Sequence, residues 1–314
     1  MFGHVAEANS YPFSIEALQL RSGHQIIAHN KGPAPISAVI SIVELHNIGS
    51  NQRWPAMSVV PPHSDLTIGV VYPKDPTSGS NFKTSAAFRL GVLGAQHDPS
   101  TLYRMPYLDG RTFTIGQAPG GPITSHNTPE SQFAIDFTMP EGTLILAARS
   151  GIVIDIEENY TEGGKEARLL SKANSVRILH SDGTIATYAH LMPGGVGVSV
   201  KIGQGIEAGE IIGYAGSTGY SSGPHLHFSV SKIIENNGEL SELSVPVKFY
   251  VGKPIVEFEP RIGLRVTANY VSAIDPMRLD QSKTAMTSTK IKSTLVGQFS
   301  SPQNSDAATQ SLDN

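Results

Sequence analysis

The sequence predicts an all-β protein in which an N-terminal small β-sandwich precedes a C-terminal antiparallel β domain. Short runs rich in β-branched residues alternate with turns along most of the chain, and 31 glycines and 21 prolines are spread over 314 residues. This composition is typical of many short strands. No long segment shows a 3.6-residue hydrophobic period, so extended helices are not expected.

Residues 13–104 are predicted to form the sandwich, an accessory domain of immunoglobulin-like architecture. The runs "HQIIAHN", "AVISIVEL" and "DLTIGVVY" are rich in β-branched residues, and the turn-forming stretches "NKGPAP" and "NIGSN" separate them. Regular spacing of short strands and turns favours two packed sheets. The histidines of this part are scattered, and we interpret them as ordinary surface or core residues.

Residues 105–250 are predicted to form the second β domain. After the polar, glycine-rich stretch "YLDGRTFTIGQAPGGPITSHNTPESQ", strand-like pieces such as "GTLILAARSGIVIDIEE" and "NSVRILHSDGTIATYAHL" alternate with glycine turns. Residues 275–314 are rich in Ser, Thr, Gln and Asp, with few aromatic residues and no period. We therefore expect a disordered polar tail there.

Composition excludes several classes of function. The net charge of −4 provides no basic surface for nucleic acid or anionic lipid. The absence of cysteine excludes disulfides, thiolate nucleophiles and cysteine metal sites. No apolar run approaches the roughly 20 residues of a transmembrane helix. The opening residues "MFGHVAEANS" lack the charged and apolar regions of a signal peptide, so none is expected in this sequence.

The stretch "SSGPHLHFSV" carries two histidines one residue apart on a predicted strand. Side chains on a strand alternate between its faces, so His225 and His227 should share one face. Leu226 and Phe228 should point from the other face into the core. The two imidazoles are therefore expected to point together into a polar space.

Two further strands follow the same pattern. In "FAIDF", Asp136 points away from its apolar neighbours, and in "TYAHL" the alternation predicts that Tyr188 and His190 share a face. His126 lies in the loop that precedes Asp136. Three ligands of nitrogen and oxygen type, with one position left for water, are typical of catalytic zinc sites. An H-x-H pair alone is a weak signal, because a hydrogen-bonded structural histidine is the commoner case, and the alternation does not show that these strands meet.

Ordered motifs make the signal far more specific. "SHNTPESQFAIDFTMPEGTLILAARSGIV", "NSVRILHSDGTIATYAHL" and "IEAGEIIGYAGSTGYSSGPHLHFSV" follow one another in the chain. Together they resemble the lysostaphin-type (LytM-like) zinc metallopeptidases, the peptidoglycan endopeptidases of bacterial cell walls. The resemblance covers roughly residues 120–232. It implies that the second domain has the lysostaphin-like fold, a duplicated hybrid motif.

The resemblance also implies the site residues. His126, Asp136 and His227 would bind Zn²⁺, while His190 and His225 would be the catalytic histidines that do not bind it. His126 and Asp136 are ten positions apart, further than in many members of the family, so a longer loop is expected between them. The motif assigns no role to Tyr188.

The resemblance implies a zinc-dependent endopeptidase that cleaves peptide bonds in peptidoglycan cross-links or stem peptides. A zinc-activated water would be the nucleophile, and the two other histidines would act as acid, base and oxyanion stabilisers. Peptidoglycan peptides would be the partners, and their location implies a periplasmic or secreted protein.

Two alternatives remain open. One is a non-hydrolytic regulatory or wall-binding protein of the same fold that activates another hydrolase, although such members typically lack site residues that are present here. The other is an N-terminal domain that carries the main function as an adhesion module. The sequence does not fix the bond that is cut or the oligomeric state.

Overall fold

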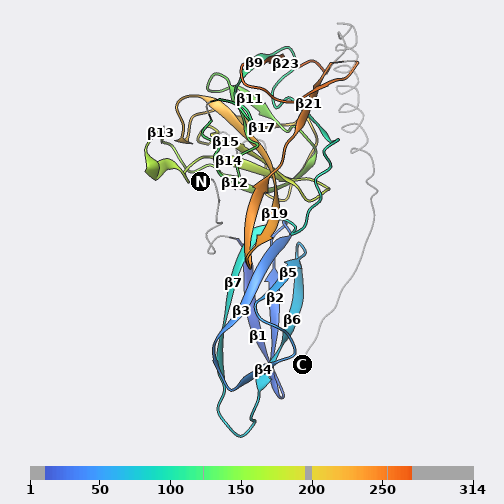
Figure 1. Ribbon diagram of the computed structural model, residues 1–314, viewed down its shortest axis with the longest axis vertical. Helices are drawn as coiled ribbons and strands as arrows, with labels where there is room; N and C mark the ends of the chain where they lie inside the picture. Colours follow the sequence, from blue (N-terminus) through green and yellow to red (C-terminus); the bar gives the residue numbers. More distant parts are fainter. Residues whose placement is uncertain (1–10, 123, 195–199, 253, 271–314) are drawn as a thin grey trace, which may run out of the picture. The chain divides into compact units, whose positions relative to one another are not determined.

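The structure is a computed structural model that describes residues 11–122, 124–194, 200–252 and 254–270. Within these residues it is almost wholly β, as Figure 1 shows, and the predicted all-β class is confirmed. The helical segment among these described residues is the short 3₁₀ turn η1, Ala167–Leu169. The predicted tail, residues 275–314, lies outside the described residues. Among the described residues, no helix has the length and apolar character needed to cross a membrane.

Two sheets built from residues 13–90 form the sandwich, drawn in blue to cyan in Figure 1. One has the order β1-β2-β6-β4, with bounds Phe13–Leu20, Gly23–Asn30, Ser64–Pro73 and Ile48–Ser50. The other has the order β5-β3-β7, with bounds Ala56–Val60, Ile36–His46 and Asn81–Leu90. Alternate side chains of both sheets, such as Ile26 and Ile40, meet in one buried apolar cluster. This is the arrangement that a half-buried period-two pattern predicts.

A large antiparallel sheet forms the second part. Its order is β16-β12-β14-β15-β19-β10-β9-β23, and β20 also pairs with β19. The bounds in that order are Gly205–Ile206, Gly151–Glu157, Ser175–Leu179, Ile185–Ala189, His225–Asn236, Ile135–Thr138, Thr112–Gln117 and Arg265–Thr267, with β20 at Glu239–Ser244. Three small sheets accompany it: β11 (Leu144–Leu146) with β17 (Ile211–Tyr214), β13 (Gly163–Gly164) with β18 (Gly219–Tyr220), and β22 (Val256–Phe258) with β21 (Lys248–Val251) and β8 (Leu102–Arg104).

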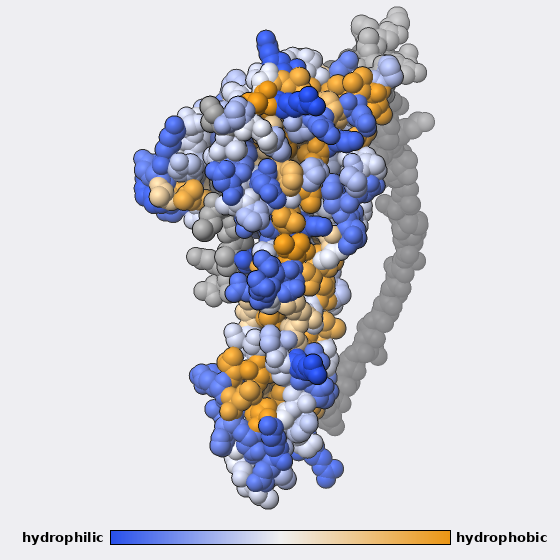
Figure 2. Space-filling model, in the orientation of Figure 1, coloured by the Kyte–Doolittle hydropathy of each residue, from blue (hydrophilic) through white to orange (hydrophobic). Residues whose placement is uncertain are grey.

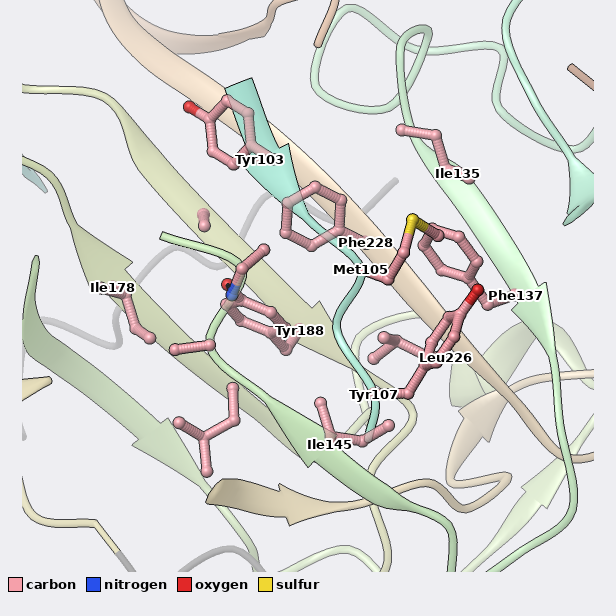
Figure 3. Close-up of a cluster of buried hydrophobic side chains, with 14 of the residues drawn as sticks. Tyr103, Met105, Tyr107, Ile135, Phe137, Ile145, Ile178, Tyr188, Leu226 and Phe228 are labelled. Carbon is pink, nitrogen blue, oxygen red and sulfur yellow. Dashed lines mark hydrogen bonds between the residues drawn. The ribbon is translucent and has the colours of Figure 1, made fainter. Parts of the chain in front are cut away.

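One face of the large sheet carries the main hydrophobic core, shown in Figure 3. Leu226 and Phe228 of β19 are fully buried there, as the alternation predicts. Aromatic rings dominate the centre: the ring of Tyr188 lies 5.1 Å from that of Phe228, and Tyr103 of β8 lies 6.1 Å from Phe228. The two histidines of β19 therefore project from the opposite face of the strand.

The expectation that Tyr188 and His190 share a face was wrong. Tyr188 pairs in register with Phe228 and points with it into the core, where it is fully buried. Strict alternation would also send His190 into the core. However, β15 ends at Ala189, and His190 has a left-handed backbone with φ of 64°. The end of the strand therefore breaks the alternation and turns His190 away from the side chain of Tyr188.

The apolar cluster of the sandwich does not stop at the sandwich. It includes Ile154 of β12, Ile185 of β15 and Ile233 of β19, all at most 1% exposed. The segment after β7 adds polar contacts, since Gly94 N donates a hydrogen bond to Ile233 O over 3.3 Å. The N-terminal sheets thus cover one end of the large sheet. The domain boundaries 13–104, 105–250 and 275–314 stay predictions.

Polar side chains cover most of the surface in view in Figure 2, and apolar side chains are exposed between them in several groups. The most exposed large apolar side chains include Leu45 and Ile255. Such mixed surfaces are normal for folded proteins. The two buried apolar clusters, and not the exposed side chains, stabilise the fold.

Removing the hydroxyl of Tyr188 is expected to destabilise the fold while the packing of the aromatic ring is kept. Ala148 N donates to this oxygen over 2.8 Å, and Tyr188→Phe would leave that buried N–H without its acceptor. We expect a loss of about 1–3 kcal/mol in the free energy of unfolding, measured with denaturant. The control is Tyr72→Phe at an exposed position, where about 0.5 kcal/mol or less is expected. Equal losses in both variants would contradict the assigned role.

Acid should destabilise the fold through His180. Burial lowers the pKa of this imidazole from 6.5 to about 4, although its Nδ1 atom lies 2.8 Å from the carbonyl oxygen of Ser150. The folded state therefore binds fewer protons than the unfolded chain between these values. The stabilisation is complete above about pH 6.5 and is lost as the pH falls toward 4, by about 3 kcal/mol.

Comparing wild type with His180→Gln isolates this contribution, because the other histidines titrate in both proteins. Unfolding free energies at pH 7 and pH 4 should show the smaller acid loss in the variant. Identical pH dependence of the two proteins would show that His180 is not buried in the neutral form.

Candidate metal centre

The pairing of β10 with β19 brings the first two site residues together. In this antiparallel register Asp136 lies opposite His227, and Thr138 lies opposite His225. Cross-strand partners project from the same face of a sheet. Accordingly, Asp136 Oδ1 lies 3.1 Å from His227 Nδ1, on the face opposite the core.

His126 reaches the same point from a loop. Its Nε2 atom lies 3.3 Å from Asp136 Oδ1, and its ring centre lies 4.9 Å from that of His227. Ligand atoms of His126, Asp136 and His227 all lie within 4.8 Å of one another, and all three residues are buried. Two imidazole nitrogens and one carboxylate oxygen thus converge, which is a donor set that suits a catalytic zinc ion.

The long separation between His126 and Asp136 is spanned by a folded loop. Within it, Ser131 N and Gln132 N donate hydrogen bonds to Thr128 O. Its far side is tied to β20, because both the backbone N–H and the hydroxyl of Ser244 donate to Pro129 O over 2.8 Å. The expected longer loop is therefore present, and it is held to β20.

His190 and His225 lie beside this group. Their ring centres are 4.5 Å apart, and that of His190 is 5.9 Å from His227. The Nε2 atom of His225 is 3.8 Å from Asp136 Oδ2. The five residues singled out in the sequence therefore lie in one place, contributed by β10, β19, the end of β15 and the loop before β10.

Backbone carbonyls determine which nitrogen of these two rings carries the proton. His190 Nδ1 lies 2.6 Å from Thr218 O, and His225 Nδ1 lies 2.8 Å from Gly223 O. A carbonyl oxygen can only accept a hydrogen bond, so each Nδ1 is the protonated donor. The lone pair of each neutral ring then resides on Nε2, which is the form needed to accept a proton.

Charge in the site is concentrated on Asp136. Burial alone would raise the pKa of this carboxyl, but hydrogen bonds with His126 and His227 outweigh burial and hold the pKa below its ordinary value. Burial lowers the pKa of His190 to about 3, with help from the nearby His225 and His227. Burial also lowers the pKa of His227, against the opposing effect of Asp136. The site therefore combines an ionised carboxylate with the neutral imidazoles of His190 and His227.

One residue of the site was missed by sequence reasoning. Gln117, the last residue of β9, donates from Nε2 to Asp136 Oδ2 over 2.6 Å. It stands in the polar, glycine-rich stretch before His126, where no periodicity distinguishes it. Only the register of β9 with β10, which pairs Gln117 with Asp136, would have identified it.

Residues 130–241 match the model of peptidase family M23. This range contains Asp136, His190, His225 and His227, whereas His126 precedes it. A curated relative from Buchnera aphidicola subsp. Baizongia pistaciae, described as an uncharacterized metalloprotease, is 37% identical over 109 residues, or 35% of this chain and 25% of the relative. Lysostaphin of Staphylococcus simulans is 30% identical over 141 residues, or 45% and 24% of the two chains.

Peptidoglycan DD-endopeptidase ShyA of Vibrio cholerae is 32% identical over 109 residues, or 35% of this chain and 22% of the relative. The chain thus spans about a quarter of the length of these curated relatives. Among solved structures, the catalytic domain of lysostaphin from Staphylococcus simulans is 30% identical and covers 38% of this chain and 78% of its own, with a TM-score of 0.26. The match to peptidase family M23 thus covers the part of the chain that contains four of the five site residues.

Proposed function

We propose that this protein is a zinc-dependent endopeptidase that hydrolyses peptide bonds in peptidoglycan cross-links or stem peptides. The observation that supports it most strongly is the buried convergence of His126, Asp136 and His227 within 4.8 Å, with two further histidines beside it. The family match supports a peptidase. The substrate class is supported by the name of the relative from Vibrio cholerae.

In this proposal His126, Asp136 and His227 hold the metal ion. Their chemistry fits zinc, since all three donors are nitrogen or oxygen and the chain contains no cysteine. When bound, zinc polarises the scissile carbonyl and lowers the pKa of a bound water to about 7. Asp136 contributes its negative charge, and the two imidazoles bind as neutral ligands.

His190 and His225 carry the protons of the reaction. With their Nδ1 protons directed at Thr218 O and Gly223 O, both rings offer Nε2 as the basic atom. One ring accepts the proton of the attacking water and later delivers it to the leaving amine. The imidazolium formed in this way stabilises negative charge on the carbonyl oxygen of the substrate. The carbonyl contacts keep both rings oriented throughout.

The proposed substrate implies where the protein works. Peptidoglycan lies outside the cytoplasmic membrane, so we infer a periplasmic or secreted location.

Replacing His225 and replacing His227 should have different effects on the metal content of the protein. We expect His227→Ala to lose most of the bound zinc, because it removes a ligand, and His225→Ala to retain it. Elemental analysis of the purified proteins, normalised to protein, measures this difference. Chelation should abolish hydrolysis by wild type, and added zinc should restore it. A wild type that holds no zinc, or equal loss in both variants, would contradict the ligand assignment.

Replacing His190 should separate metal binding from catalysis. We expect His190→Ala to keep its zinc but to lower kcat by about 100-fold or more, because a general acid–base group is removed. The assay is digestion of purified peptidoglycan followed by mass spectrometry of the released muropeptides. His180→Gln serves as the control, since it replaces a buried histidine outside the site. If zinc-loaded wild type releases no products, the peptidase proposal fails and the regulatory alternative gains support.

A further inference from the structure

We propose that Gln117 is a positioning residue that orients Asp136 and the His126 loop toward each other and so preorganises the metal site. The inference rests on the proposed metal site. It assigns a specific role to a side chain that acts through a proposed metal ligand, Asp136, and through the residue before another.

Gln117 uses both ends of its amide group within the site. Nε2 donates to Asp136 Oδ2 over 2.6 Å, while Oε1 accepts a hydrogen bond from Ser125 N over 2.8 Å. Ser125 is the residue directly before His126. A single side chain thus connects the strand that carries one proposed ligand with the loop that carries another.

The contact with Asp136 fixes the orientation of its carboxylate group. Oδ1 is the atom near His126 Nε2 and His227 Nδ1, at 3.3 and 3.1 Å. Oδ2 is occupied by the amide of Gln117, so rotation of the carboxylate would break that hydrogen bond. Partners that orient metal ligands in this way contribute substantially to metal affinity.

The contact with Ser125 restricts the loop. Because His126 and Asp136 are ten positions apart, the backbone between them does not fix their separation. Ser244 holds this loop at Pro129, and Gln117 holds the residue directly before His126. Ordering the loop in advance reduces the conformational entropy that metal binding would otherwise have to remove.

The role requires a primary amide of this length. Asp136 needs a donor, and the N–H of Ser125 needs an acceptor. Methionine has a similar length but supplies neither group effectively, and asparagine has both groups on a side chain one methylene shorter. These two substitutions therefore remove the two contacts in different ways.

The test is zinc affinity, measured by competition with a chromophoric chelator, for wild type, Gln117→Met and Gln117→Asn. We expect both variants to bind zinc about 10- to 100-fold more weakly than wild type. The matched control is Gln25→Met, which removes a similar strand glutamine whose Nε2 donates to Thr67 Oγ1 over 2.9 Å in the sandwich. This control should bind zinc as wild type does.

Cobalt substitution adds a readout that general destabilisation would not change. At saturating Co²⁺, the visible absorption bands of Gln117→Met and Gln117→Asn should differ from those of wild type, because the carboxylate ligand is no longer held in one orientation. Thermal melting shows whether each variant is folded, and Gln117→Asn provides the answer if Gln117→Met does not fold.

Three results would separate the possibilities. Weaker zinc binding with altered cobalt bands, confined to position 117, supports the inference. Wild-type affinity and bands in a folded position-117 variant overturn it and leave the metal site intact. Absence of zinc binding by wild type overturns the proposed function and this inference with it.

Discussion

The carboxylate of Asp136 is the group on which the arrangement of the site depends. It is 5% exposed, and an isolated charge in such a position would be strongly disfavoured. His126 and His227 approach one oxygen, while Gln117 donates to the other. The register of β10 with β19 places Asp136 directly opposite His227 and so brings the first two residues of the site together. The remaining partners then follow from the need to satisfy a buried carboxylate.

Regular strands explain what could be predicted from the sequence. β19 alternates without interruption at its start, so the assignment of Leu226 and Phe228 to the core and of the two histidines to the opposite face required only a period of two. The same rule failed for Tyr188 and His190, because a strand end and a left-handed residue cannot be read from alternation. The meeting of His126 with Asp136 was expected from the resemblance alone. The role of Gln117 could not be predicted from the sequence, since it depends on the register of β9 with β10.

The glycine-rich segment between β17 and β19, which contains β18, links backbone geometry to proton chemistry. Gly219 has φ of 79°, and a Cβ atom there would lie 2.8 Å from the backbone of Ala173, so glycine is required. This turn presents the carbonyl oxygens of Thr218 and Gly223 to His190 and His225. Thr218 is itself held, because its hydroxyl donates to Leu191 O over 2.8 Å. The glycine-rich turn therefore sets the tautomers of both histidines.

The sharing of one apolar cluster between the sandwich and the large sheet has a consequence for how the chain can be divided. Ile154, Ile185 and Ile233 are hidden beneath the N-terminal sheets. In a fragment that began at β8, these three isoleucine side chains would be exposed to water, each at a cost of roughly 1.5–3 kcal/mol. The exposed apolar surface would also favour self-association of such fragments. The N-terminal sheets thus shield apolar side chains of β12, β15 and β19 from water, and two of these strands lead into or carry the histidines of the site.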